Sequence, residues 1–275
     1  MTVKLVADID SLVTQVRNDG FCVIPDIIPA AKCDAMQERL TTVALRWRRA
    51  EKLRELKTSY VPGLINFDQS CAEYIAAEPV LAVVEQLLGR NLRVSFTTLL
   101  TSEPQRKRST WHADWPFNQM NACHLPAPYP DLCMHVTALL MISPFSKENG
   151  GTLIVPGSHR QPTNPSDRSL GFDPYSAHPD EFCVTGSAGS MVLFDSRTWH
   201  CPPANPSSEA RICVGVRYAP WWLNLEPLDP GGQLRQQWVI EPGLTENEQP
   251  RISPEAYGAL PERARPLYRH WVAKE

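Results

Sequence analysis

The sequence predicts a mainly β, α+β protein in which a β-sandwich or β-barrel is flanked by helices on one side. Helical apolar spacing comes first and a series of short strand-like runs follows, an order typical of the α+β class. The hydrophobic content of 43% over 275 residues suffices for one sizeable core, and no linker divides the chain. We expect residues 1–275 to form a single domain, with a helical N-terminal part (about 1–90), a β core (about 91–220) and a C-terminal extension (221–275).

The N-terminal part is expected to contain three helices and one short strand. Residues 8–18 place apolar side chains at helical spacing, and Gly20 ends the pattern before the apolar run Phe21–Ile24, a short strand. Apolar residues recur at helical spacing across Pro29–Lys57, which predicts a long helix that becomes charged towards its end. A third helix is expected over Pro79–Leu88, because proline suits a first turn and a glycine follows as a stop signal.

The β core is expected to contain six strands, because six runs rich in β-branched and aromatic residues are separated by turn-rich loops. They are Leu92–Thr101, Ser109–Asp114, Cys133–Ile142, Thr152–Val155, Ser190–Asp195 and Arg211–Tyr218. The 26 prolines, against 14 glycines, mark long, stiffened loops. In the run Cys133–Ile142 the even-numbered residues are apolar and are expected in the core, whereas the orientation of His135 and Thr137 stays open. Beyond the core, Ser253-Pro254-Glu255 predicts a helix start and Pro261–Ala273 a terminal helix.

Charge and targeting features argue against nucleic acid and membranes as partners. The formal net charge is −3 and the pI about 6.2, and the basic clusters Arg46–Lys57 and Arg106–Arg108 are interpreted as solvated faces. The first ten residues carry acids where a signal peptide needs an apolar core, and no run approaches the roughly 18 apolar residues of a membrane span. The eight cysteines form no Cys-x-x-Cys pair, which favours reduced thiols in a cytoplasmic protein.

The stretch Thr110–Phe117 contains a histidine and an aspartate two positions apart. Successive strand side chains point to opposite faces, so His112 and Asp114 are expected to project together from one face. Two histidines and one carboxylate form the facial triad of mononuclear non-haem Fe(II) sites. The best candidate for the third ligand is His200, which lies 88 positions after His112, just beyond an expected strand. By itself, the His-x-Asp pair is also consistent with a surface ion pair.

Five motifs, taken in order, resemble those of the phytanoyl-CoA dioxygenase (PhyH-like) family, a branch of the Fe(II)/2-oxoglutarate oxygenases. These motifs are His112-x-Asp114, Glu148–Thr152, Pro156–His159, His200 and Arg211. The resemblance extends over most of the chain, from near its start to the end of the last expected strand. It implies that the β core is a double-stranded β-helix, the jelly-roll or cupin-like fold, with N-terminal helices at its flank.

The resemblance also implies roles for individual residues. His112, Asp114 and His200 are implied as iron ligands, and Arg211 as the salt-bridge partner of the distal carboxylate of 2-oxoglutarate. A guanidinium presents its donors as a planar fork that matches a carboxylate, which suits this role. Thr152 is implied as a further contact of the same cosubstrate carboxylate.

Other residues near these motifs have alternative interpretations. Arg217 lies on the same strand face as Arg211 by the period of two and is the rival anchor for the cosubstrate. Trp115 and Phe117 directly follow the ligand segment, and we expect them to shape a substrate pocket with apolar or planar surface. His159 is interpreted as a turn residue that satisfies backbone groups.

The resulting prediction is an Fe(II)- and 2-oxoglutarate-dependent dioxygenase that hydroxylates or desaturates a small-molecule metabolite with O2, releasing succinate and CO2. Natural-product metabolism is one setting in which the family acts. Asp114 disfavours halogenation, because related halogenases carry a small residue at that ligand position. The run Trp115–Tyr129 differs from that of ectoine-specific members, and no basic cluster marks a coenzyme A site. The alternatives are a cupin-like metal enzyme that does not use 2-oxoglutarate, and a non-catalytic binding module; neither substrate nor oligomeric state follows from the sequence.

Overall fold

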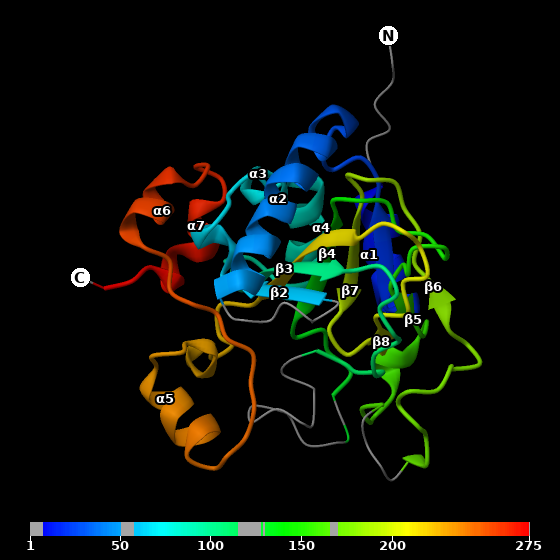
Figure 1. Ribbon diagram of the computed structural model, residues 1–275. Coiled ribbons are helices and arrows are strands. Elements are labelled where there is room, and N and C mark those ends of the chain that lie inside the picture. Colours follow the sequence, from blue (N-terminus) through cyan, green and yellow to red (C-terminus); the bar gives the residue numbers. More distant parts are fainter. Residues whose placement is uncertain (1–7, 51–57, 115–127, 129, 166–169, 275) are drawn as a thin grey trace.

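The computed structural model describes residues 8–50, 58–114, 128, 130–165 and 170–274. Two antiparallel sheets form its β core, and helices cover one of them (Figure 1). The large sheet has the strand order β1 (Phe21–Ile24), β7 (Met191–Asp195), β4 (Val136–Met141), β9 (Arg211–Ala219), β3 (Arg93–Ser102) and β2 (Thr58–Pro62). The small sheet has the order β6 (Phe182–Cys183), β5 (Leu153–Ile154) and β8 (His200–Cys201). The predicted α+β class is therefore confirmed, and two strands from the N-terminal part, β1 and β2, occupy the edges of the large sheet.

The N-terminal helices pack their apolar faces onto the large sheet. They are α1 (Ile9–Asp19), α2 (Ala30–Ala50), α3 (Ala72–Ile75) and α4 (Glu78–Leu88). Their buried residues belong to the same core cluster as the even-numbered residues of β4, as predicted. Asp8 begins α1 as its N-cap, and Gly20 ends it in the left-handed conformation at a φ of 88°. Among the described residues, no helix combines the length and the apolar character needed to cross a membrane.

The C-terminal extension is attached to the large sheet through strand β3. It contains α5 (Gln233–Arg235), a π turn (Gln236–Ile240), α6 (Pro254–Ala259), α7 (Arg265–Tyr268) and a 3-10 turn (Arg269–Trp271). Trp271 donates its indole N–H to the Val94 carbonyl at 2.8 Å, and Gln249 accepts the Thr97 N–H at 2.9 Å. Ser253 caps α6 as predicted, whereas the expected helix over 261–273 is shortened to α7 and the turn after it. In Figure 1 the helices α6 and α7 lie across the molecule from the small sheet.

One expected strand is wrong, and its location matters for the site. Residues 109–114 form no strand and take part only in an isolated bridge, between His112 and His200. The neighbouring backbone N–H groups bond to three separate segments, at Pro174, Ser196 and Pro202, and therefore never build a ladder. The side chains of His112 and Asp114 nevertheless lie together.

Replacing Gly189 by alanine is expected to destabilise the fold by roughly 3 kcal/mol, because strain and overlap act together. Gly189 has a φ of 89°, and an added Cβ would lie 2.2 Å from the Ile28 carbonyl oxygen, whose residue donates its own N–H to Gly189. Gly243→Ala is the matched control, since Gly243 has a φ of 71° but nothing within 4 Å of an added Cβ. Urea denaturation measures both variants, and equal losses of unfolding free energy would contradict the overlap argument.

Candidate metal centre

Three side chains with metal-binding donors converge where the small sheet meets the inner face of the large one. The donor atoms of His112, Asp114 and His200 all lie within 4.8 Å of one another. His112 and His200 exchange backbone hydrogen bonds, N–H to carbonyl, at 3.0 and 2.9 Å. This pairing sets the centres of the two imidazole rings 4.2 Å apart, although the residues are distant in sequence. The convergence predicted from the motif order is therefore present in the structure.

Each imidazole is held with one nitrogen facing the cluster. Nδ1 of His112 lies 3.0 Å from the Thr110 carbonyl oxygen, and Nδ1 of His200 lies 3.0 Å from the Thr198 carbonyl oxygen. A carbonyl only accepts hydrogen bonds, so both Nδ1 atoms carry the proton and both Nε2 atoms offer a lone pair. Burial, and then the neighbouring His112, lower the pKa of His200 to about 4, so this ring is neutral at pH 7.

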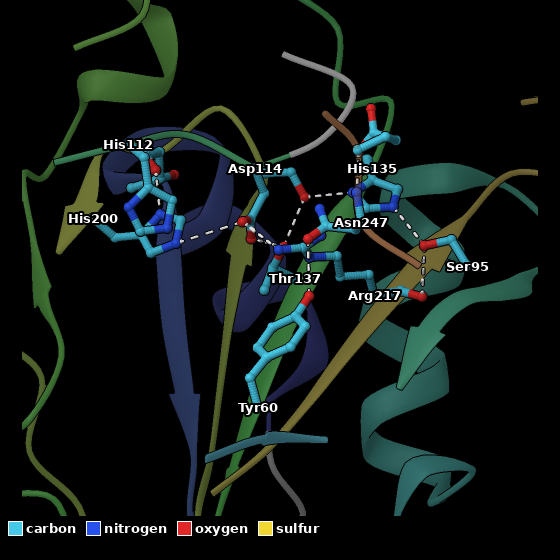
Figure 2. Close-up of polar contacts among 12 residues, drawn as sticks. Tyr60, Ser95, His112, Asp114, His135, Thr137, His200, Arg217 and Asn247 are labelled. Atoms are coloured by element: carbon cyan, nitrogen blue, oxygen red, sulfur yellow. Dashed lines mark hydrogen bonds and ion pairs between the residues drawn. The ribbon is translucent and has the colours of Figure 1, made fainter. Parts of the chain in front are cut away.

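Asp114 is 3% exposed and is contacted from three directions (Figure 2). Thr137 donates its hydroxyl to Oδ2 at 2.6 Å, and Nη2 of Arg217 lies 2.5 Å from Oδ1. The same Oδ1 is 3.7 Å from Nε2 of His200. Burial alone would raise the pKa of this carboxyl, but Arg217 above all, together with His200 and His112, holds that pKa below its usual range. Asp114 is therefore an anion, the form that a metal ligand requires.

A chain of hydrogen bonds extends from Asp114 into the core. Thr137 bonds to the hydroxyl of Ser196 at 2.9 Å, and Ser196 bonds to Nδ1 of His135 at 2.7 Å. Nε2 of His135 in turn lies 2.7 Å from the Ser95 hydroxyl (Figure 2). His135 is fully buried, and burial lowers its pKa to about 3, so it is neutral. The orientation of His135 and Thr137, left open by the sequence, is thus towards the inner side of the large sheet.

Thr137→Val is expected to lower metal affinity by about tenfold, with little change in overall stability. Valine keeps the shape of the side chain but removes the hydroxyl that orients Asp114 and bonds to Ser196. Thr137→Ser retains the hydroxyl and serves as the control. Titration with Co(II), followed by its visible absorption, measures the affinities. Equal affinity in the valine and serine variants would show that the hydroxyl does not position the carboxylate.

A cavity of about 250 Å³ adjoins the three donors. Among its lining residues are the predicted anchor Arg211 and the predicted contact Thr152. Arg211 is 6% exposed, and its guanidinium carbon lies 4.4 Å from the centre of the Phe145 ring. Its Nε is buried without a hydrogen-bond partner, and so is the hydroxyl of Ser102, its cross-strand neighbour on β3. Within the described residues, Arg211 forms no ion pair, so this end of the cavity offers buried donors suited to a carboxylate.

Sequence reasoning missed two members of this cavity. Arg106 lines it, and burial followed by the charge of Arg211 lowers the pKa of Arg106. Its interpretation as part of a solvated face is therefore wrong, because the segment folds back and its guanidinium lies 3.4 Å from the Pro202 carbonyl oxygen. Ser102 is the second residue, and only the register of β3 against β9 reveals its position.

The remaining candidates occupy other places. Trp115 and Phe117, expected to shape the substrate pocket, lie outside the described residues. Arg217, the rival anchor, lines the cavity but bonds to Asp114. His159 bonds through Nε2 to the Arg17 carbonyl oxygen, in keeping with its interpretation as a residue that satisfies backbone groups.

The sequence model of one protein family, described as phytanoyl-CoA dioxygenase (PhyH), matches residues 16–213, which is most of the chain. The chain belongs to the phytanoyl-CoA dioxygenase family. Its relatives include protein Rv1501 of Mycobacterium tuberculosis, 26% identical over 72% of this chain and 71% of that protein. An ectoine dioxygenase of Stutzerimonas stutzeri is 25% identical over 73% of both chains. The L-proline trans-4-hydroxylase of Streptomyces griseoviridis is 24% identical over 73% of this chain and 82% of that one.

Solved structures share the fold of this phytanoyl-CoA dioxygenase family member. HygX of Streptomyces hygroscopicus, with nickel and 2-oxoglutarate bound, has a TM-score of 0.60 at 18% identity over 78% of this chain and 88% of that one. The epimerase SnoN, in complex with Fe3+, alpha ketoglutarate and nogalamycin RO, has a TM-score of 0.56 at 21% identity over 77% and 83% of the two chains. The predicted jelly-roll core is thereby confirmed. Membership of the family also confirms the predicted dioxygenase class, with its dependence on Fe(II), 2-oxoglutarate and O2.

Proposed function

We propose that this family member hydroxylates or desaturates a small-molecule metabolite, with Fe(II) bound by His112, Asp114 and His200 and with 2-oxoglutarate anchored by Arg211. The observation that carries the proposal is the combination of donors in one cavity. Two imidazoles present free Nε2 atoms beside a buried carboxylate, and the buried guanidinium of Arg211 has no acidic partner among the described residues. Two histidines and one carboxylate leave open positions on Fe(II) for a chelating cosubstrate and for O2.

Each part of the chain has a distinct task in this proposal. The carbonyls of Thr110 and Thr198 keep the two imidazoles in the tautomer that binds metal, and Thr137 orients the carboxylate. Arg211 holds the distal carboxylate of 2-oxoglutarate as a fork, and Thr152 lines the same cavity as a further contact. Bound Fe(II) supplies the activation of O2, which couples oxidation of the substrate to conversion of 2-oxoglutarate into succinate and CO2.

The two alternative functions find less support. A cupin-like metal enzyme that does not use 2-oxoglutarate has no need for a buried guanidinium in the cavity beside the metal donors, whereas Arg211 occupies that place. A non-catalytic binding module has no reason to keep three convergent donors with fixed imidazole tautomers. Relatives named for action on ectoine and on L-proline support a small molecule as the substrate here.

Spectroscopy followed by turnover tests the proposal. The protein is mixed with Fe(II) and 2-oxoglutarate without O2, and the weak visible charge-transfer band of the chelate is recorded. Air is then admitted and succinate is assayed. A band followed by succinate supports the proposal. Tight metal binding without a band would favour a metal enzyme that does not use 2-oxoglutarate, and absence of metal binding would favour a binding module.

A further inference from the structure

The cavity beside the metal centre carries more positive than negative charge. Of the described residues that line it, Arg106, Arg211 and Arg217 carry guanidinium groups, and Asp114 carries the single carboxylate. Two acids outside the lining are paired with arginines: Glu103 with Arg48 at 2.9 Å and Glu248 with Arg235 at 2.9 Å. Residues 115–127, which follow the ligand segment, include no aspartate, glutamate, lysine or arginine in the sequence. The described lining of the cavity therefore carries three guanidinium groups against one carboxylate.

Binding of Fe(II) and 2-oxoglutarate does not remove this surplus of positive charge. Fe(II) brings two positive charges, and the two carboxylates of 2-oxoglutarate bring two negative charges, so the pair is neutral overall. Positive charge inside a poorly hydrated cavity is costly unless an anion accompanies it. The group still missing from the loaded site is therefore an anion, and the primary substrate is the component left to supply it.

Arg217 is the guanidinium placed to receive that anion. It bonds to Oδ1 of Asp114, the oxygen that faces His200, so its partner is also a candidate metal ligand. Metal binding would neutralise Asp114 and weaken its attraction for Arg217. Among the described residues, the Arg217 guanidinium has no other hydrogen-bond acceptor. Its remaining N–H groups are not among the polar atoms that are fully buried without a partner, so they stay accessible. They are thus available to a ligand in the cavity.

Arg211 and Arg217 are too far apart to share one carboxylate. They are six positions apart on β9, or about 20 Å along the strand, and both line the cavity. If 2-oxoglutarate binds the metal through its keto-acid end, its distal carboxylate would need a basic partner farther from the metal. The guanidinium that touches a metal ligand, Arg217, is therefore poorly placed for that distal carboxylate, and Arg211 is well placed.

Aromatic rings lie beside Arg217. Its guanidinium carbon lies 5.0 Å from the centre of the Phe96 ring, and Tyr60 stacks on that ring with centres 5.8 Å apart. Leu139 and Val216 line the same cavity. The Tyr60 hydroxyl is occupied, since it donates to Asn247 of the C-terminal extension at 2.8 Å (Figure 2). An apolar body with one acidic group matches this combination of a ring surface and a guanidinium.

We propose that Arg217 anchors the carboxylate of the primary substrate, which is a small organic acid with an apolar body packed against Phe96 and Tyr60. The assignment rests on the proposed function, because metal binding by Asp114 is what weakens the hold of this carboxylate on Arg217. Arg217 is then a specificity-determining residue: it accepts acids and rejects neutral analogues of the same shape. The charge-assisted bond formed by the acid is the source of the discrimination.

A pair of probes that differ only in charge tests the assignment. 3-Phenylpropionate and 3-phenylpropionamide are titrated separately into the anaerobic complex of the protein with Fe(II) and 2-oxoglutarate. Perturbation of the chelate band reports binding without turnover. We expect the acid to bind at least tenfold more tightly than the amide. Arg217→Gln should weaken binding of the acid at least tenfold and leave the affinity for the amide unchanged. Arg217→Lys should keep part of the preference for the acid over the amide.

The controls separate this assignment from the proposed function. Arg263→Gln removes one exposed arginine from the C-terminal extension and should leave both titrations as in the wild type. Absence of the chelate band in the wild type would refute the proposed function, whereas a band that persists allows the assignment to be judged by itself. Equal affinity of acid and amide, or no response to either, would overturn the assignment. If Arg217→Gln also lost the chelate band, the titrations of the wild type and of Arg217→Lys would still show whether the acid binds more tightly than the amide.

Discussion

Asp114→Ala is expected to abolish metal binding at micromolar concentrations and to reduce succinate formation on the order of 1,000-fold. The substitution removes the one anionic donor of the cluster and leaves the charge of Arg217 beside the two imidazoles without its partner. A cation that approaches His112 and His200 then meets net repulsion instead of attraction. Titration with Fe(II) under anaerobic conditions measures the affinity, and succinate formation in air measures the turnover.

Two further variants show whether the loss reflects the ligand itself. Asp114→Asn keeps the shape and an acceptor for Thr137 but removes the charge, and it should lose most of the metal affinity. Asp34→Ala, at an exposed position of α2, removes a carboxylate remote from the donors and should behave as the wild type. Circular dichroism confirms folding of each variant. Wild-type metal affinity in folded Asp114→Ala protein would refute the assignment of the metal centre.

Arg211→Ala is expected to raise the 2-oxoglutarate concentration needed for half-saturation by about 100-fold while leaving metal affinity nearly intact. A charge-assisted hydrogen bond contributes about 1.5–3 kcal/mol, and Arg211 provides the guanidinium fork expected to hold the distal carboxylate. Anaerobic titration of the Fe(II)-loaded protein with 2-oxoglutarate, followed by the chelate band, measures this change directly. A separate Co(II) titration measures the metal affinity.

Arg217, the rival anchor for 2-oxoglutarate, provides the comparison for Arg211→Ala. Arg217→Gln should leave the affinity for 2-oxoglutarate within a few-fold of the wild type, because Arg217 contacts Asp114 at the other end of β9. A large loss in Arg217→Gln with none in Arg211→Ala would reverse the two roles. A parallel loss of metal and 2-oxoglutarate affinity in Arg211→Ala would instead make Arg211 a structural residue.

The predictable part of the site consists of residues that belong to ordered motifs. His112, Asp114, His200 and Arg211 stand in a sequence order that resembles the family, and the structure brings all four to one cavity. Helix boundaries were also accessible, because capping signals such as Ser253 act within a few residues. Local chemistry and motif order therefore predicted the architecture of the chain and its candidate ligands.

The contacts that tune the site depend on strand register and were not predictable. Arg217 was placed on the correct strand face by its period of two, but its partner Asp114 lies more than 100 positions away. The same holds for Ser102 opposite Arg211 on the neighbouring strand. His135 was ambiguous for the same reason, since alternation gives two faces without saying which one meets water. The false strand over 109–114 arose because a ladder needs a partner that the sequence does not name.

The reciprocal backbone bonds between His112 and His200 imply that the metal site is preorganised by folding. All three donors are already brought together by folding, because Thr137 and Arg217 hold the carboxylate of Asp114 as the backbone bonds hold the two imidazoles. In many small metalloproteins, by contrast, folding and metal binding occur as one event. Here we expect the apoprotein to fold with its three donors preassembled, so that one divalent ion can replace another without rearrangement of the backbone.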